Sequence, residues 1–390
     1  MFIELHILQN FAPSCLNRDD TNSPKECEFG GFRRARISSQ CLKRSIRTCF
    51  GKSALLPEEN LARRTKLLVE EVAKRLEKPG RDRQQAQAVV ETALSGAGLA
   101  TDNGATQYLL FLGRDEIQVL ATLCEKNWDT LAALAKPGTG DEAGKATRKG
   151  KKAAKQEFPA DLKKQVLGFL DGGKAADLAL FGRMLADIPG KNIDAACQVA
   201  HAISTNKVGV EFDFYTAVDD LQPQGETGAG MMGTIEFNSG CFYRYANIDL
   251  DQLNSNLGGD EELARKTVEA FIRAAVAAIP TGKQNSMAAQ NPPSLVFAVV
   301  REHGLWSLAN AFVKPVQPGR DGDLVSKSIE QLEKYWACLE AMYGTVGDGK
   351  WAVVLDGSQL KSLKNVGSIQ VLIEKVMKSL KFNNTKEAGK

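Results

Sequence analysis

The sequence has few of the residues from which catalytic and metal sites are built. Only three of its 390 residues are histidines, and His6, His201 and His303 lie too far apart in the chain to form a metal-binding pair of short spacing. The eight cysteines are scattered, with neither the two-residue spacing of zinc ribbons nor the density of a disulfide-stabilised domain. We expect free, mostly buried thiols and no catalytic site, metal or cofactor.

Long apolar segments are also missing. The longest, such as "SLVFAVV" at residues 294–300, fall far short of the roughly 20 residues of a membrane-spanning helix. The first residues, "MFIELHIL", have neither the positive start nor the small-residue cleavage site of a signal peptide. With 43% hydrophobic and 25% charged residues, the composition favours a cytoplasmic protein without membrane association, built as one large domain with insertions or as two ordinary domains.

Acidic residues are missing from one window of the chain. Residues 29–57 contain no Asp or Glu but seven Lys or Arg, whereas the net charge of the whole chain is only +3. The rest of the chain is therefore slightly negative, and the positive charge is concentrated near the start. A polyanion, and nucleic acid in particular, is the simplest partner for such a surface.

The first half of the chain predicts a strand, a polar loop, a helix and then a helical region. Residues 2–8 alternate as a strand does, with apolar residues at 3, 5 and 7 and Glu4 and His6 on the other face. A helix begins at Ser38 or Ser39, and residues 55–185 are mostly helical, with amphipathic stretches at 61–76 and 115–134. The Gly- and Lys-rich segment 137–157 has no apolar period, which predicts a mobile, solvated surface loop.

The second half alternates strands and helices in a mixed order. This order indicates an α+β fold, and the simplest assembly is one split βαβ sheet domain with a helical insertion after its first helix. The predicted strands cover residues 233–250, 294–302 and 351–357, and the predicted helices cover 260–279, 326–344 and 368–381.

The helix after residue 38 has two distinct faces. At about 100° per residue, Ile46 lies at about 40° and Cys49 at about 340° from Leu42, which defines a core stripe. The opposite face, at about 100° to 200°, carries hydrogen-bond donors: Lys43, Arg47, Gln40 and Arg44. A solvated polar face of this kind is common to amphipathic helices and does not by itself indicate binding.

The start of this helix favours binding more strongly. Ser38 or Ser39 can cap it, but neither has the Glu or Gln three residues later that would complete a capping box. Arg33, Arg34 and Arg36 instead crowd the positive end of the helix dipole, where acids are preferred. We interpret this conflict as a site for an incoming phosphate.

Two other patterns favour structural interpretations. "GAGMMG" at residues 228–233 has the glycines of a dinucleotide fingerprint, but a strand pattern follows it instead of a helix, so we predict a hairpin tip. Asp219 and Asp220 are adjacent strand residues that point to opposite faces, which favours a turn or strand end over a metal site.

Several segments resemble the crRNA-backbone subunit, or CasC-type family, of the type I-E CRISPR Cascade surveillance complex. The resemblance runs in the same order from the first strand to about residue 313. Its segments are "SCLNRDD" (14–20), "FGGFRRARISSQCLKR" (29–44), "AHAIST" (200–205), "YTAVDDLQ" (215–222), "FNSGCFYRYANIDL" (237–250) and "GKQNSMAAQNPP" (282–293).

The resemblance implies a ferredoxin-like, RNA-recognition-type palm with a helical finger insertion and a β-hairpin thumb. We expect the palm in residues 1–53 and 186–390, the finger in 54–185, and the thumb at about 210–240, with the glycine-rich segment at its tip. The finger matches the family loosely, and the Lys-rich loop is additional to it.

The family implies a non-catalytic subunit that polymerises along crRNA in antiviral defence, holding the RNA backbone and kinking it at intervals so that bases can pair with target DNA. Its partners would be crRNA, target DNA through the guide, further copies of itself head to tail, and the other Cascade subunits: the large subunit, the small subunits, the handle-capping subunit and the repeat-cleaving endoribonuclease.

Residue by residue, the resemblance implies contacts at the RNA backbone and at its kinks. Met184 would be the wedge beside a kinked base, although the residues alone leave an ordinary core methionine equally open. Tyr243 and Tyr245 could stack bases, but we favour core or subunit packing for them. The implied RNA-binding residues are Arg18, Ser38, Ser39, Gln40, Lys43, Arg44, Arg47, Arg183, Met184, Tyr215, Thr216, Lys283, Gln284, Asn285 and Ser286.

Two alternatives stay open at this point. Backbone subunits of RNA-targeting CRISPR complexes cleave RNA with a loop aspartate, and Asp19 and Asp20 lie in such a loop here. The other alternative is a generic single-stranded RNA-binding protein without partner subunits.

Overall fold

The computed structural model describes residues 1–77, 80–102, 104–135, 158–217, 220, 231–320, 323–344, 349–355 and 360–382. The predicted loop at 137–157, Asp219 and most of the predicted thumb tip lie outside these residues. The chain forms two compact units. The first comprises Met1–Leu56, Ala196–Asn254 and Glu261–Lys390, and the second comprises Pro57–Ala195 and Ser255–Asp260.

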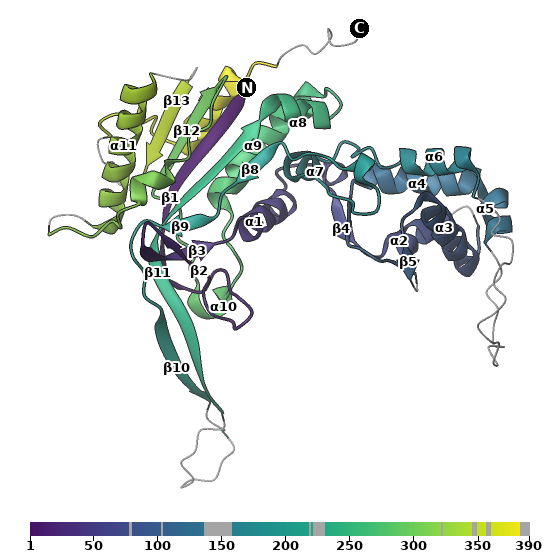
Figure 1. Cartoon of the computed structure of the whole chain (residues 1–390), viewed down its shortest axis with the longest axis horizontal. Coiled ribbons are helices and arrows are strands. Elements are labelled where there is room, and N and C mark those ends of the chain that lie inside the picture. Colours follow the sequence, from purple (N-terminus) through teal and green to yellow (C-terminus); the bar gives the residue numbers. More distant parts are fainter. Residues whose placement is uncertain are drawn as a thin grey trace. The chain divides into compact units, whose positions relative to one another are not determined.

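The first unit is built on a nine-stranded sheet whose strand pairs are antiparallel (Figure 1). The main path runs in the order β13-β12-β1-β11-β9-β3-β2, and β8 and β10 also pair with β11. The strands are β1 (Phe2–Ser14), β2 (Glu26–Phe29), β3 (Phe32–Ile37), β8 (Cys197–Val199), β9 (Ala202–Ser204), β10 (Glu211–Ala217), β11 (Met231–Asp249), β12 (Leu295–Arg301) and β13 (Gly349–Val354).

Helices cover both faces of this sheet. On one face, α11 packs against β1 and β11; on the other, α1 packs against α9, which in turn contacts α12. The predicted α+β class and the three C-terminal helices are confirmed. The helices are α1 (Ser39–Lys52), α8 (Leu250–Asn256), α9 (Glu261–Ala277), α10 (Gln284–Met287), η3 (Leu308–Phe312), α11 (Leu324–Tyr343) and α12 (Ile369–Ser379).

The central strand β1 is buried on both faces, because it lies between β11 and β12 and under helices on either side. Glu4 and His6, on the face opposite Ile3 and Leu5, are therefore buried as well. Glu4 Oε1 forms an ion pair with Arg301 Nε at 2.8 Å, and both side chains are fully buried. Glu4 Oε2 accepts hydrogen bonds from the Tyr245 hydroxyl (2.6 Å) and from the Trp306 backbone N–H (2.8 Å). Burial raises the pKa of Glu4, and the Tyr245 hydrogen bond and the Arg301 charge oppose this shift.

His6 lies beside this ion pair among aromatic rings. Its Nδ1 is 2.9 Å from the Tyr243 hydroxyl, which also accepts the Leu308 backbone N–H at 2.7 Å. The ring stacks on Tyr245 and on Phe297 at centroid distances of 5.2 and 5.3 Å. Burial, aided by the Arg301 charge, lowers the pKa of His6 to about 3. Tyr243 and Tyr245 are thus core residues, as we favoured from the sequence.

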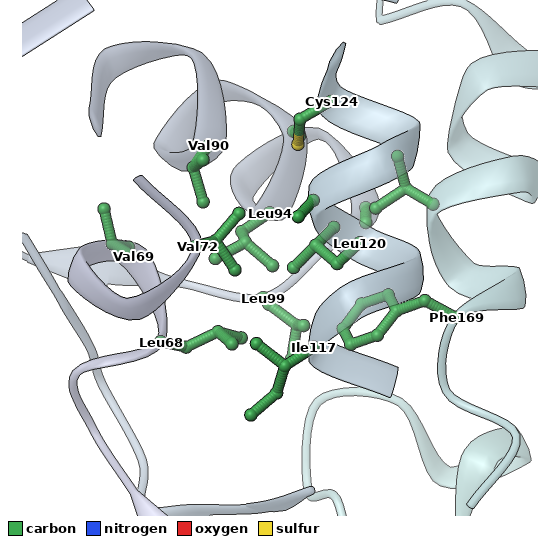
Figure 2. Close-up of a cluster of buried hydrophobic side chains, with 14 of the residues drawn as sticks. Leu68, Val69, Val72, Val90, Leu94, Leu99, Ile117, Leu120, Cys124 and Phe169 are labelled. Carbon is green, nitrogen blue, oxygen red and sulfur yellow. The ribbon is translucent and has the colours of Figure 1, made fainter. Parts of the chain in front are cut away.

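The second unit has a helical core of its own. Figure 2 shows Val72 of α2, Leu94 of α3, Leu120 of α4 and Phe169 converging in this core. The predicted helix at 115–134 is two helices, since Asn127 separates α4 from α5. The elements are η1 (Glu58–Asn60), β4 (Arg63–Thr65), α2 (Leu68–Glu77), α3 (Arg83–Ala97), β5 (Thr101–Asp102), β6 (Ala105–Thr106), β7 (Leu110–Leu112), α4 (Arg114–Lys126), α5 (Trp128–Leu134), α6 (Ala160–Gly168), α7 (Ala176–Phe181) and η2 (Pro189–Lys191).

The described residues contain neither disulfide bonds nor a helix that could span a membrane. The eight cysteines are free; four are buried, three are half-buried and Cys338 is exposed. Among the described helices, none has both the length and the apolar character needed to cross a membrane.

The buried His6 predicts a pH dependence of stability. The unfolded chain binds a proton at histidine near pH 6.5, whereas folded His6 does so only near pH 3. His6 therefore lowers the free energy of unfolding as pH falls from about 6.5 towards 3, by at most about 1.4 kcal/mol per pH unit. In urea unfolding at pH 7, 6 and 5, His6→Gln should lose this component while its amide oxygen can still accept from Tyr243.

The expected result is a stability difference between wild type and His6→Gln that shifts in favour of the variant as pH falls. His303→Gln, which changes an exposed histidine, is the matched control. Parallel pH profiles for wild type and His6→Gln would contradict the prediction.

Candidate nucleic-acid interface

Helix α1 forms the centre of the candidate interface. The helix begins at Ser39, and the buried Ser38 caps it by accepting the Cys41 backbone N–H at 3.3 Å. Leu42, Ile46 and Phe50 are buried, which confirms the core stripe through Leu42 and Ile46. Away from this stripe, Gln40 and Arg44 are exposed, and Ser39, Lys43 and Arg47 are half-buried. The predicted polar and basic face therefore lies at the surface of the helix.

The arginines that precede α1 have partners within the chain. Arg34 is fully buried and donates to four backbone carbonyls, those of Ser204, Thr205, Phe312 and Val313, at 2.6 to 3.2 Å. The structure thus assigns it to the core of the unit instead of to an anion site.

Glu26 contacts the other two arginines of this stretch, Arg33 and Arg36. It lies outside the acid-free window, but the pairing of β2 with β3 brings it beside the arginines. Its carboxylate forms an ion pair with Arg33, and its backbone carbonyl accepts from Arg36 Nε at 3.2 Å. Arg34 therefore cannot contribute to a phosphate site, because burial and backbone carbonyls supply its partners. For Arg33 and Arg36 the phosphate site stays a prediction, since the Arg33 side chain is 68% exposed beside Glu26.

The loop between β1 and β2 is held by its own polar side chains. Asp19 Oδ1 accepts the backbone N–H groups of Thr21 (2.9 Å) and Ser23 (3.0 Å) and the Thr21 hydroxyl (2.8 Å). The hydrogen bond from the Thr21 side chain, with these backbone bonds, lowers the pKa of Asp19, which is exposed. Arg18 donates to Asn22 Oδ1 at 3.1 Å, so its guanidinium is oriented by the same loop.

This loop and α1 enclose a groove of about 500 Å³. Three cations, Arg18, Arg44 and Lys52, line it together with one acid, Asp19. Lys52, Ser45 and Thr48 were not among the site residues predicted from the sequence. The signal for Lys52 was present, because the acid-free window includes it and the helical wheel places it at about 280°, next to Arg44 at about 200°. The full lining is Leu16, Asn17, Arg18, Asp19, Asn22, Cys41, Arg44, Ser45, Thr48, Lys52, Thr281 and Gly282.

Thr281 and Gly282 form the remaining wall of the groove, and residues 283–286 follow directly after it. A Cβ atom at Gly282 would lie 2.4 Å from the Leu16 carbonyl oxygen, so the close approach of these two walls requires glycine. Lys283 has a left-handed backbone (φ 49°). Burial raises the pKa of the Cys15 thiol, and the nearby charges of Arg18 and Lys283 oppose this shift. The predicted residues Arg18, Arg44 and Lys283 thus surround one region.

The remaining predicted residues of this segment differ in their surroundings. Gln284 is half-buried, and its amide donates to the carbonyls of Pro280 (3.0 Å) and Ala289 (3.3 Å). Asn285 and Ser286 are exposed, and the Ser286 hydroxyl donates to the Lys283 carbonyl at 3.2 Å. Gln284 therefore shapes the turn, while Asn285 and Ser286 lie at its surface.

The β10–β11 hairpin stands where the thumb was predicted (Figure 1). Tyr215 pairs with Gly233 and Thr216 with Met232, and every residue of β10 is exposed. A Cβ atom at Gly233 would lie 2.5 Å from the Tyr215 hydroxyl, so the Tyr215 ring lies across this glycine. The hairpin thus presents side chains to solvent along its length.

Met184 and Arg183, in the second unit, have opposite environments. Met184 is 83% exposed and lies beyond the end of α7 at Phe181, so it is neither helical nor a core methionine. Arg183 is buried, and its guanidinium donates to both carboxylate oxygens of the buried Glu116 at 2.7 and 2.9 Å. The Arg183 side chain thus pairs with Glu116 inside the unit and does not lie at the surface as an RNA contact would require. Arg183 and Met184 differ because successive residues of an extended segment point in opposite directions.

The chain is similar in sequence and in fold to known proteins. A family model described as "CT1975-like protein" matches residues 3–379. One solved structure, titled "CRISPR RNA-guided surveillance complex, pre-nicking", contains a chain 32% identical to this one, with a TM-score of 0.81 and coverage of 97% of this chain and 99% of that chain. Another, titled "CRISPR RNA-guided surveillance complex", has 27% identity, a TM-score of 0.72 and coverage of 97% and 100%.

No curated protein matches the chain. The family model and the two structures confirm the resemblance carried by the sequence segments, and the structural likeness confirms the predicted fold class over nearly the whole chain.

Proposed function

The chain belongs to the CT1975-like protein family, and we propose that it is the guide-RNA-binding backbone subunit of a type I-E CRISPR Cascade complex. The observation that carries this proposal is the basic, polar surface of α1 together with the groove beside it, in a chain that matches CRISPR surveillance-complex chains over nearly its full length. The complex would be a cytoplasmic ribonucleoprotein in antiviral defence.

The chemistry of the surface suits contacts with the sugar–phosphate backbone. Its exposed groups are guanidinium, ammonium, hydroxyl and amide groups, which bind phosphate and ribose without reading sequence. The aromatic residues Tyr243 and Tyr245 of β11 are buried, so these two side chains offer no platform for stacking bases. A backbone-only grip leaves the bases free to pair with a target DNA strand, and one protein can then serve any guide.

The exposed apolar side chains of the hairpin support assembly with further copies. Phe212 and Phe214 are 67% and 63% exposed on β10, and Met232 on β11 is 67% exposed. Exposed apolar residues gathered on one element mark an interaction surface. In the proposed filament, the hairpin of one copy contacts the RNA and the next copy, and the other Cascade subunits bind at the ends and along the filament.

The basic face of α1 predicts the salt dependence of guide binding. Lys43→Glu combined with Arg47→Glu should weaken guide-RNA binding roughly tenfold or more and make its dependence on salt shallower, because fewer phosphates are neutralised. Fluorescence anisotropy with a guide RNA between 50 and about 300 mM salt measures both effects.

The matched control is Lys327→Glu with Lys334→Glu on α11, which makes the same change of charge on the opposite side of the sheet. An unchanged salt slope in the α1 variant would place the RNA elsewhere on the protein.

The exposed side chain of Met184 predicts a local effect on RNA conformation. Met184→Ala should leave the affinity for guide RNA within about twofold, because one apolar contact adds little to a backbone grip of many charges. It should change the chemical reactivity of the bases at the kinks, as measured by probing the bound guide. Met342→Ala, at a methionine that is 74% exposed on α11, is the control. Identical reactivity patterns for wild type and Met184→Ala would show that Met184 is not the wedge.

The proposed subunit is non-catalytic. The assembled complex, incubated with RNA complementary to the guide and with Mg²⁺, should leave that RNA intact. Cleavage at regular intervals that is abolished by Asp19→Ala or Asp20→Ala would replace the proposal with a loop-aspartate endonuclease. The chain should also copurify with companion subunits and a guide of defined length, whereas a monomer with random RNA would indicate a generic RNA-binding protein.

A further inference from the structure

Helix α1 has a second polar flank that faces the groove. With Leu42 at zero, Thr48 lies at about 240°, Cys41 at about 260°, Lys52 at about 280° and Ser45 at about 300°. These four residues line the groove, whereas the predicted donors Gln40, Lys43 and Arg47 lie at about 100° to 160° and do not. Arg44, at about 200°, separates the two flanks and also lines the groove. The two flanks therefore contact different parts of any ligand that lies across α1.

The hydroxyl groups on the groove flank serve as acceptors. Ser45 donates its hydroxyl hydrogen to the Cys41 carbonyl at 3.0 Å, and Thr48 donates to the carbonyls of Arg44 and Ser45, each at 3.0 Å. A hydroxyl has one hydrogen and two lone pairs, so each oxygen retains the capacity to accept. Because a phosphate diester has no hydrogen to donate, these oxygens suit a ligand group that can donate one.

The cations around the groove suit the other part of such a ligand. Arg18, Arg44 and Lys52 are exposed, and they outnumber the single acid, Asp19. Asn22 orients the Arg18 guanidinium, which prepares it to bind a phosphate. The volume of about 500 Å³ lies within the usual range for sites that hold a small ligand of nucleotide size.

We infer that this groove holds a ribonucleotide of the guide strand and selects RNA over DNA through the 2′-hydroxyl group. The inference rests on the proposed function. The cations bind the phosphates on either side of the sugar, and the oxygens of Ser45 and Thr48 accept the 2′-hydroxyl hydrogen. DNA lacks this hydrogen, and it is the group by which a protein distinguishes the two polymers at a given site.

The experiment uses the full chain and three oligonucleotides of one sequence, with ribose, 2′-deoxyribose or 2′-fluororibose. The 2′-fluoro probe keeps an RNA-like sugar conformation but cannot donate a hydrogen bond, so it separates the hydroxyl contact from the shape of the strand. Ser45→Ala combined with Thr48→Val should lower the ratio of RNA affinity to 2′-fluoro affinity by roughly 3- to 10-fold, the range of one or two hydrogen bonds.

Thr122→Val is the matched control. Thr122 lies exposed on α4, and its hydroxyl donates to the Gln118 carbonyl one turn earlier at 3.1 Å, as Thr48 does to Arg44. The control should keep the wild-type affinity ratio. If the double variant binds RNA but keeps that ratio as well, the inference is overturned.

Lys52→Gln provides a second test at an exposed residue in the last turn of α1. It should weaken the binding of all three probes and make the salt slope shallower by about 0.7, the contribution of one phosphate contact to a single strand. Lys126→Gln, in the last turn of α4, is its control. An unchanged slope in Lys52→Gln would remove the phosphate part of the inference.

The outcomes also distinguish this inference from the proposed function. If Lys43→Glu with Arg47→Glu loses guide binding while the groove variants keep their affinity, ratio and slope, the proposed function stands and the inference fails. If the wild-type chain binds none of the three probes, both fail.

Discussion

The buried ion pair between Glu4 and Arg301 is the interaction on which the rest of the structure depends. Both charges are fully buried, so either one alone would destabilise the fold by about 3 to 5 kcal/mol, and the pair persists because Tyr245 and Trp306 supply further contacts. The pair joins β1 to the end of β12, and Tyr245 joins it to β11. The groove loop follows β1 in the chain, and the first residues of β11 form one strand of the hairpin, so the network lies on the two strands that continue into both parts of the candidate interface.

A second constraint decides where positive charge reaches the surface. Arg34 is enclosed by carbonyls, and Glu26 binds Arg33 and Arg36, so the basic stretch is divided between the interior and the surface. Exposed basic side chains remain at Arg33 on β3, on α1 and on the adjoining loop. The groove and the basic flank of α1 thus carry two separate sets of groups, one with cations and acceptors and one with cations and an amide. Under the proposed function, both sets would contact a single strand of RNA.

The two faces of the sheet explain why the protein would hold a strand by its backbone. An RNA-recognition sheet that binds bases leaves one face open for aromatic stacking. Here helices cover both faces, and the aromatic residues of β11 serve the core beside His6 and Trp336. Under the proposed function, the RNA would then lie along helix and loop surfaces, where guanidinium, ammonium and hydroxyl groups would contact phosphate and ribose instead of bases.

Much of the fold followed from local pattern. The alternation at residues 2–8, the core stripe of α1 and the amphipathic segments of the second half predicted real elements, because strand and helix periods depend on neighbouring residues in the chain. The site was predictable in part: Gln40, Lys43, Arg44 and Arg47 lie on one face by helical geometry alone, and the sequence segments carried the family resemblance.

Tertiary structure decided which charges meet. Arg34 contacts Ser204 and Phe312, Arg183 pairs with Glu116, and Gly282 approaches Leu16, all across more than 60 residues of sequence. Glu4 and His6 alternate with apolar residues along β1, and packing on both sides of the strand buries them. Composition and periodicity therefore determined the elements and the basic character of residues 29–57. Burial and contacts between distant segments determined which of these charges lie at the surface, because those contacts involve groups far away in the sequence that no local pattern contains.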